Sequence, residues 1–356
     1  MRKILLNPGP VTLSDRVRNS LMKEDFCHRE EKFASILLSI KSKLLDVYKL
    51  DTSFDAVLLS GSGTGAVEAM LSSLVSNEEE VLVVSNGVYG ERMAKMLTYS
   101  KKKFKLLSHS WIEETNFDDL EEILKERTFS KLLFVHNETT TGRLNNLDKV
   151  LRLCELYSVD LILDAVSSFG AEKIDFSSTA LMAVASTANK CLHGITGSSF
   201  VISKKENFSL GKKNSLSLYF DLFSYYESQK EGWCPFTPSV HSLFALLEAI
   251  NELQELGGWK ARNESYRSKL KYIRNALHSK GIKALLSEEE SSSMISSFYL
   301  PKNKTYQQIY EEFQNDGFII YAGQGNLSDK IFRICNMGDI NKDDLKRLKK
   351  TINKIF

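Results

Sequence analysis

The stretch Ala56-Val-Leu-Leu-Ser-Gly-Ser-Gly-Thr-Gly-Ala-Val-Glu-Ala-Met-Leu71 is the one that most directly indicates the fold. A short apolar run is followed by a turn of small residues and then by a segment with helical periodicity. The same pattern recurs up to about residue 202. The apolar runs of strand length are Ala56-Val-Leu-Leu59, Val81-Leu-Val-Val84, Leu132-Leu-Phe-Val135, Leu161-Ile-Leu163, Leu181-Met-Ala-Val184 and Phe200-Val-Ile202. Strands separated by helices predict an α/β domain with a mainly parallel sheet.

Beyond about residue 240 the pattern changes. Segments 240–256 and 259–280 have the spacing of long amphipathic helices, joined by a turn at Gly257-Gly258. After the serine-rich stretch 287–297, three apolar runs look like strands: Phe298-Tyr-Leu300, Phe318-Ile-Ile-Tyr321 and Ile331-Phe-Arg-Ile334. We therefore expect a large domain over residues 1–257 and a smaller α+β domain over residues 258–356.

Composition indicates the class of protein. The chain has 356 residues, 42% hydrophobic and 26% charged, as in globular proteins large enough for two domains. Its 47 basic and 45 acidic residues leave a net charge of +2, which offers no electrostatic footprint for nucleic acid. Five scattered cysteines without metal-site spacing suit a reducing compartment better than a disulfide framework or a zinc site. With no recognisable signal peptide or membrane span, we expect a cytoplasmic protein.

Polar residues follow the predicted strands, at the sheet edge where α/β proteins bind ligands. Ser60-Gly-Ser-Gly-Thr-Gly65 lies between a strand and a helix, so its N–H groups and the positive helix end can hold a phosphate. It matches neither the Walker A loop nor the Rossmann fingerprint, which argues against a nicotinamide dehydrogenase. Taken alone, such a turn is as often a plain tight turn as a phosphate site.

Two more residues at strand ends point to a cofactor. Asp164 ends a buried apolar strand, where an ionised carboxylate needs a cationic or donor partner; helix capping explains it equally well. Lys190 follows a later strand, and a lone loop lysine is usually only solvated. Together with the phosphate turn and Tyr89, the two match the needs of pyridoxal 5'-phosphate. Its phosphate takes a helix end, its aldehyde a lysine, its pyridinium nitrogen a carboxylate, and its ring an aromatic partner.

Longer stretches identify a family. Over nearly its whole length the chain resembles the class-V, fold-type-I aminotransferases, which use pyridoxal phosphate. The resembling stretches are Leu6-Asn-Pro-Gly-Pro10, Gly61-Ser-Gly-Thr-Gly-Ala-Val-Glu-Ala69, Asn86-Gly-Val-Tyr-Gly-Glu-Arg-Met-Ala-Lys95, His136-Asn-Glu-Thr-Thr-Thr-Gly142, Asp164-Ala-Val-Ser-Ser-Phe-Gly170 and Ser186-Thr-Ala-Asn-Lys-Cys-Leu192. Two pieces of these stretches, Tyr89-Gly-Glu-Arg-Met-Ala-Lys95 and Glu138-Thr-Thr-Thr-Gly142, resemble a subgroup that acts on a phosphonate. The resemblance implies a seven-stranded sheet in the large domain, and an amino-terminal arm, residues 1–20, that contributes to the cleft.

The resemblance also implies residue roles. Lys190 would bind the cofactor's aldehyde as a Schiff base and then carry a proton between substrate and cofactor, while Asp164 would pair with the pyridinium nitrogen. Tyr89 would stack on the ring. The other implied contacts are Ser62, Gly63 and Thr64 to the phosphate, Thr139 near the phenolic oxygen, Arg333 to the substrate anion, Pro8 and Gly9 in the opposite wall, and Thr237 of the neighbouring subunit to the phosphate. The last contact implies a homodimer with active sites at the subunit interface, and no metal is implied.

The reaction implied is amino transfer from 2-aminoethylphosphonate to pyruvate, or its reverse. Arg333 suits carboxylate and phosphonate anions alike, although an ion pair on a surface strand would explain it equally well. Two departures from the subgroup keep rivals open: Gln324 stands where a lysine is more usual, and His28 follows Cys27 where a proline is. The rivals are an alanine–glyoxylate or serine–pyruvate type aminotransferase and, more remotely, an inactive ligand-binding protein.

Several reactive residue types are expected to be structural. His136, His193 and His241 lack metal-site spacing and are expected to form hydrogen bonds. Cys191 and Cys335 are expected to be buried packing thiols.

Overall fold

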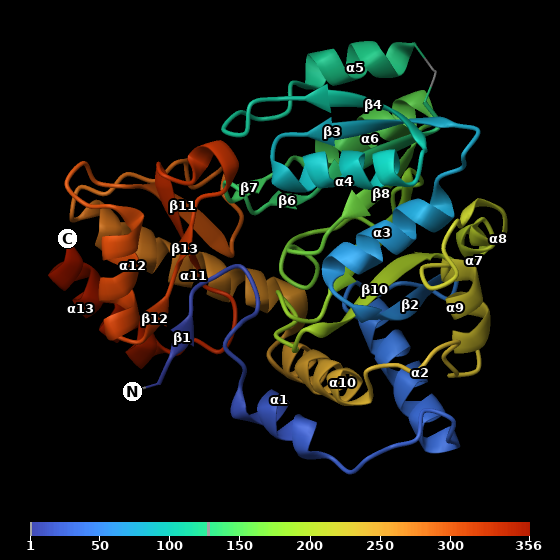
Figure 1. Cartoon of the computed structure of the whole chain (residues 1–356), viewed down its shortest axis with the longest axis horizontal. Coiled ribbons are helices and arrows are strands. Elements are labelled where there is room, and N and C mark those ends of the chain that lie inside the picture. The colour runs from blue at the N-terminus through green and yellow to red at the C-terminus, as the bar shows by residue number, and fades with distance from the viewer. Residues whose placement is uncertain (1, 127–128) are drawn as a thin grey trace.

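The computed structural model describes residues 2–126 and 129–356, so residue 1 of the expected arm lies outside the described residues. Within them, a seven-stranded sheet forms the centre of the larger unit (Figure 1). In spatial order its strands are β2 (Phe54–Gly61), β10 (Gly197–Lys204), β9 (Leu181–Thr187), β8 (Asp160–Asp164), β5 (Lys131–Val135), β3 (Glu80–Ser85) and β4 (Lys103–Ser108). Strand β10 is antiparallel to both neighbours, and the remaining pairs are parallel. The predicted α/β fold with a mainly parallel sheet is confirmed.

Alternate side chains of the sheet build two separate cores. In β2, Val57 and Leu59 belong to one core, and Ala56 and Leu58 to the other. The first core is closed by α3 (Gly63–Leu74), α4 (Val88–Tyr99), α7 (Lys205–Phe208) and α9 (Leu222–Gln229), with α8 (Gly211–Asn214) between the last two in the chain. The second is closed by α2 (Glu31–Asp46), α5 (Phe117–Lys125), α6 (Leu147–Tyr157) and α10 (Val240–Glu255). Burial on both faces explains why the strands read as continuous apolar runs.

Strand β4 was not predicted. It lies at the sheet edge, where β3 is its only partner within the described residues, and most of its side chains are exposed. Its sequence, Lys103-Phe-Lys-Leu-Leu-Ser108, carries the lysines that protect an edge from pairing with another chain. An edge strand needs no continuous apolar run, so the pattern that revealed the other strands is missing here.

A smaller unit follows the turn at Gly257 and Gly258, whose φ angles of 97° and 75° confirm the expected turn. Its elements are α11 (Gly258–His278), α12 (Tyr306–Asn315), η2 (Gly325–Leu327), α13 (Lys342–Ile355) and a sheet ordered β11 (Ile295–Tyr299), β14 (Ile331–Cys335), β13 (Tyr321–Ala322). Strand β11 begins inside the serine-rich stretch. Ser296 and Ser297 are each only 2% exposed, so polarity there does not mark a surface loop.

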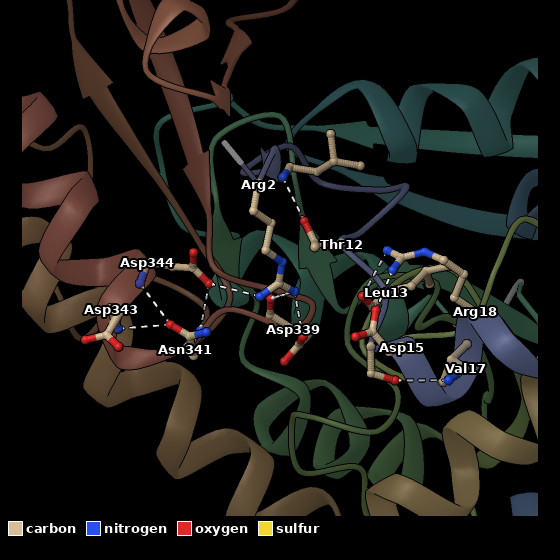
Figure 2. A network of polar contacts seen from close by, with 12 residues as sticks. Arg2, Thr12, Leu13, Asp15, Val17, Arg18, Asp339, Asn341, Asp343 and Asp344 are labelled. Atoms are coloured by element: carbon tan, nitrogen blue, oxygen red, sulfur yellow. Dashed lines mark hydrogen bonds and ion pairs between the residues drawn. The ribbon is translucent and has the colours of Figure 1, made fainter.

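The amino-terminal segment departs from the expected division. Strand β1 (Ile4–Leu5) pairs in parallel with β12 (Phe318–Ile319), and Ile4 is fully buried in the core of the smaller unit. Arg2 forms ion pairs with Asp339 (2.6 Å) and Asp344 (3.3 Å), as Figure 2 shows. Residues 2–6 therefore pack with the carboxy-terminal part of the chain rather than with the large sheet, because their apolar side chains complete its core. The chain then continues through α1 (Asp15–Asn19) and η1 (Ser20–Met22).

None of the helices in the described part of the chain is both long and apolar enough to cross a bilayer.

Candidate active site

The amino end of α3 borders a cavity of about 420 Å³ at the edge of the large sheet. Ser62 caps the helix, its hydroxyl accepting a hydrogen bond from the Gly65 amide at 3.4 Å. A Cβ atom on Gly63 would lie 2.6 Å from Val166 Cγ1, so the turn can approach the neighbouring loop only with glycine here. The predicted residues that line the cavity are Ser62, Gly63, Thr64, Tyr89 and Lys190. The helix end gives this cavity a positive potential suited to an anion.

Lys190 reaches the cavity from the turn that follows β9, and its side chain is half-buried. The amino-terminal arm passes close to it: a Cβ atom on Gly9, whose φ is +104°, would lie 3.3 Å from Lys190 Cε. Pro8 is buried just before it. The structure therefore brings the expected arm and the expected lysine together, and side-chain substitution at residue 9 would crowd that lysine.

Asp164 ends β8 and is 7% exposed. Its carboxylate accepts a hydrogen bond from the Val166 amide at 2.9 Å. Burial raises the pKa of Asp164 to about 6, against the opposing influence of that amide and of the positive charges on Lys190 and Arg92. A carboxylate in this state can accept or share a proton with a basic partner near neutral pH.

Arg92 belongs to the cavity and was assigned no role from the sequence. It follows Tyr89 by three positions on α4, so the two side chains share one helix face. Its guanidinium carbon lies 4.7 Å from the centroid of the Tyr89 ring, and Nη1 donates a hydrogen bond to the Thr64 hydroxyl at 3.3 Å. The sequence does carry a signal for this contact, because Tyr89 and Arg92 are three positions apart in a stretch expected to be helical.

Thr139 and Arg333 meet behind the cavity rather than on its lining. Arg333, on β14, is 2% exposed, and its Nη1 donates to the Thr139 carbonyl at 2.7 Å and to Gln324 Oε1 at 3.1 Å. The expectation of a surface ion pair is therefore wrong for this arginine. The Thr139 hydroxyl is buried and finds no hydrogen-bond partner in the described residues.

Thr237 lies apart from the other predicted residues. It is exposed and borders a separate small cavity beside Ser60 and Phe236. Thr237 is not among the residues of its own chain that line the cavity of Lys190.

The residues expected to be structural are mostly so. His136 hydrogen-bonds to Ser168 at 3.0 Å, and His193 contacts the Tyr266 hydroxyl. Cys191 and Cys335 are buried, as predicted.

Comparison with known proteins identifies the fold and family. Residues 17–328 match the family described as aminotransferase class-V. The chain belongs to this family. It is 35% identical to a 2-aminoethylphosphonate–pyruvate transaminase of Bacillus cytotoxicus, over 97% of this chain and 95% of that protein. Identity to one from Vibrio cholerae is 32%, with the same coverage of both chains.

Solved aminotransferase structures share the fold. The alanine–glyoxylate aminotransferase of Nostoc sp. superposes with a TM-score of 0.90 at 23% identity, covering 100% of this chain and 95% of that one. The subgroup IV aspartate aminotransferase of Thermus thermophilus gives 0.89 at 24% identity, covering 99% and 100%. As a member of the class-V family, this chain is an aminotransferase, and its cofactor is pyridoxal phosphate.

The cavity lining fits that cofactor, together with Thr139 and Asp164, which are not themselves on the lining. The α3 amino end and Arg92 provide N–H donors and positive charge for a phosphate. The Thr139 hydroxyl is a buried donor that lacks a partner in the described residues, and Asp164 is a buried carboxylate with one backbone donor. Both are groups that a polar ring with a basic nitrogen and a phenolic oxygen would satisfy.

Proposed function

We propose that this class-V aminotransferase transfers the amino group of 2-aminoethylphosphonate to pyruvate, giving phosphonoacetaldehyde and L-alanine. The similarity along nearly the whole chain to relatives of that name is the observation that carries the proposal. The reverse reaction, which makes 2-aminoethylphosphonate from phosphonoacetaldehyde, would use the same residues. The free cysteines, four of them buried with a raised thiol pKa, suit a cytoplasmic enzyme.

The proposed phosphate site is the turn at the start of α3. Its donors are the backbone amides of Gly63 and Thr64 and the hydroxyls of Ser62 and Thr64, with Arg92 adding a positive charge. A dianion gains from both the helix end and the guanidinium, since charged hydrogen bonds are about twice as strong as neutral ones.

The proposed catalytic residues are Lys190 and Asp164. Pyridoxal phosphate, when bound, supplies a covalent attachment for the amine and a ring that accepts the electrons of the broken C–H bond. Lys190 Nζ would take the proton from the substrate carbon that bears the amino group and give it to the cofactor's C4′ carbon. Asp164 holds a proton on the pyridine nitrogen, and Tyr89 provides an aromatic wall for the ring.

The proposed substrate groups are Arg333, Pro8 and Gly9. A guanidinium fork can bind the phosphonate of one substrate and the carboxylate of the other in turn. In this structure Arg333 Nη1 donates to the Thr139 carbonyl and to Gln324 Oε1, and Nε donates to the Ala322 carbonyl at 2.9 Å. Its Nη2 is the nitrogen that we propose for the substrate anion.

We also propose that the enzyme is a homodimer in which Thr237 completes the phosphate site of the partner subunit. The exposure of Thr237, and its absence from the lining of its own chain's lysine cavity, support this arrangement. Light scattering on the purified protein should give a mass of about twice 40.4 kDa.

The visible spectrum of the purified protein tests the proposal. We expect a band above 400 nm that 2-aminoethylphosphonate bleaches and pyruvate restores. A band bleached only by alanine or serine would move the enzyme to the carboxylate branch, which the Nostoc neighbour represents. Absence of any band after addition of pyridoxal phosphate would contradict the cofactor residues proposed above.

A further inference from the structure

Glu138 is a buried carboxylate that contacts the backbone of Tyr89, a residue of the cavity lining, and it has no role in the proposed function. It ends β6 (Asn137–Glu138), which forms a short hairpin with β7 (Arg143–Leu144), and it is fully buried. Its Oε1 accepts hydrogen bonds from the Thr140 amide at 3.1 Å and the Thr140 hydroxyl at 2.5 Å. A buried carboxylate is costly, so its donors must be accounted for.

A third donor belongs to helix α4, which carries Tyr89. The other carboxylate oxygen of Glu138, Oε2, accepts a hydrogen bond from the Tyr89 amide at 3.2 Å. The Val88 amide donates to the Thr140 hydroxyl at 3.1 Å. The residue before α4 is Gly87, which offers no capping side chain, so Glu138 and Thr140 act as the helix cap from a different part of the chain.

The fit between this carboxylate and the helix is close. A Cβ atom on Gly87 would lie 2.3 Å from Glu138 Cδ, so any larger residue at 87 would displace the carboxylate. The position of Tyr89 along its helix is therefore fixed by a contact with the carboxylate. A small shift of Glu138 would change where the Tyr89 ring stands.

The adjoining residue holds the substrate arginine. The Thr139 carbonyl accepts a hydrogen bond from Arg333 Nη1 at 2.7 Å. Its two neighbours in the chain, Glu138 and Thr140, are the residues that cap α4. Residues 138–140 thus fix the aromatic wall on one side and the arginine on the other.

We propose that Glu138 is a positioning residue of the transamination, which fixes Tyr89 against the cofactor ring and, through the Thr139 carbonyl, fixes Arg333 toward the substrate anion. The inference rests on the proposed function for the roles of Tyr89 and Arg333.

The pKa of Glu138 gives this proposal a measurable consequence. Burial raises the pKa of Glu138 to about 7, the Thr140 and Tyr89 donors oppose this, and the like charge of Asp164 on β8 adds to it. Glu138 in turn favours the charged form of Arg333 on β14. Because Glu138 changes charge near neutral pH, the cap on Tyr89 should weaken as the carboxyl is protonated, and the pH dependence of the enzyme should include this step.

The test compares three variants of the holoenzyme. Glu138→Gln keeps the shape but replaces one of the two accepting oxygens by an amide nitrogen, so either the Tyr89 amide or the Thr140 donors lose their acceptor. Glu138→Asp keeps the charge. Glu172→Gln is the matched control, because Glu172 is also a buried carboxylate, accepting from Ser293 N at 2.7 Å and Asn263 Nδ2 at 2.8 Å, away from Tyr89. Each variant is assayed for thermal unfolding, cofactor dissociation constant and KM against kcat over pH 6–9.

For Glu138→Gln we expect a cofactor dissociation constant raised about tenfold, KM raised for both substrates, and loss of the step near pH 7 from the pH profile. The charge-retaining Glu138→Asp should recover part of this affinity. Glu172→Gln should lower the unfolding temperature comparably and leave those values within about twofold of wild type. If Glu138→Gln only lowers the unfolding temperature, as the control does, the positioning role is wrong.

A variant that fails to fold is replaced by Thr140→Val, which removes only the hydroxyl that links Glu138 to Val88. It should raise the cofactor dissociation constant in the same direction, and an unchanged constant would overturn the inference. The proposed function has its own readout: wild-type protein that binds cofactor but accepts only alanine contradicts the phosphonate substrate and leaves the comparison of variants valid with alanine as donor.

Discussion

The guanidinium of Arg92 lies over the ring of Tyr89 at 4.7 Å from its centroid, and the same group donates to Thr64 at the start of α3. One side chain thus joins the aromatic wall to the phosphate turn. A cation here is held by a π face on one side and by a hydroxyl on the other, which leaves its remaining N–H groups for an anion.

Replacement of Arg92 should therefore weaken cofactor binding. We expect Arg92→Met to raise the dissociation constant of pyridoxal phosphate by about tenfold or more, and Arg92→Lys to recover part of the loss because it restores charge without the fork. Fluorescence titration of the cofactor-free protein measures this. Arg152→Met, which changes an exposed arginine on α6, is the control. An unaltered constant in Arg92→Met would contradict a phosphate contact.

Substitution of Lys190 tests the covalent attachment. Lys190→Ala should abolish the visible band of the bound cofactor and lower turnover by several orders of magnitude, because both the attachment and the proton carrier are lost. Lys173→Ala, at an exposed lysine paired with Asp148, should retain both. Full activity in Lys190→Ala would end the assignment.

Substitution of Asp164 tests the proton on the pyridine nitrogen. Asp164→Asn removes the charge and keeps the shape, so we expect kcat to fall by about a hundredfold or more while the cofactor still binds. The control is Asp160→Asn, at the opposite end of the same strand. A loss of less than about tenfold in kcat would contradict the role.

Gln324 tests substrate choice. It accepts a hydrogen bond from Arg333 at 3.1 Å, so a cation there would add positive charge beside the substrate anion. Gln324→Lys should raise kcat/KM for 2-aminoethylphosphonate relative to alanine by about fivefold, because the phosphonate carries more negative charge than the carboxylate. Gln324→Met, which removes the amide without adding charge, should leave the ratio unchanged. A ratio that falls in the lysine variant would show that the residue faces elsewhere.

Two carboxyl groups should make the cofactor-free protein less stable as the pH rises. Burial raises the pKa of Asp164 from 3.8 to about 6 and that of Glu138 from 4.5 to about 7. A carboxyl with a higher pKa in the folded state stabilises the fold below its unfolded pKa, and this stability is lost as the pH rises through the folded pKa. Between pH 5 and pH 8 we expect wild type to lose on the order of 1 to 3 kcal/mol more than Asp164→Asn or Glu138→Gln, measured by urea unfolding. Equal losses in wild type and variants would show that neither group titrates as described.

The core strands were predictable because they are buried on both faces and read as uninterrupted apolar runs, whereas the edge strand β4 was not. The phosphate turn, the lysine and the aspartate were predictable because each belongs to a short local pattern. Their roles stay predictions. Arg92 and Glu138 were missed for a physical reason: each is defined by partners on other elements, Thr64 for one and Tyr89 for the other. Arg333 and Thr139 are likewise far apart in the sequence, so no local pattern predicts the hydrogen bond between them.

Strand β1 completes a sheet whose other strand, β12, is made only near the far end of the chain. During synthesis Ile4 has no partner until Phe318 has left the ribosome, so the arm that carries Gly9 toward Lys190 takes its place last. The lysine cavity thus depends for one of its walls on a strand that lies near the far end of the chain.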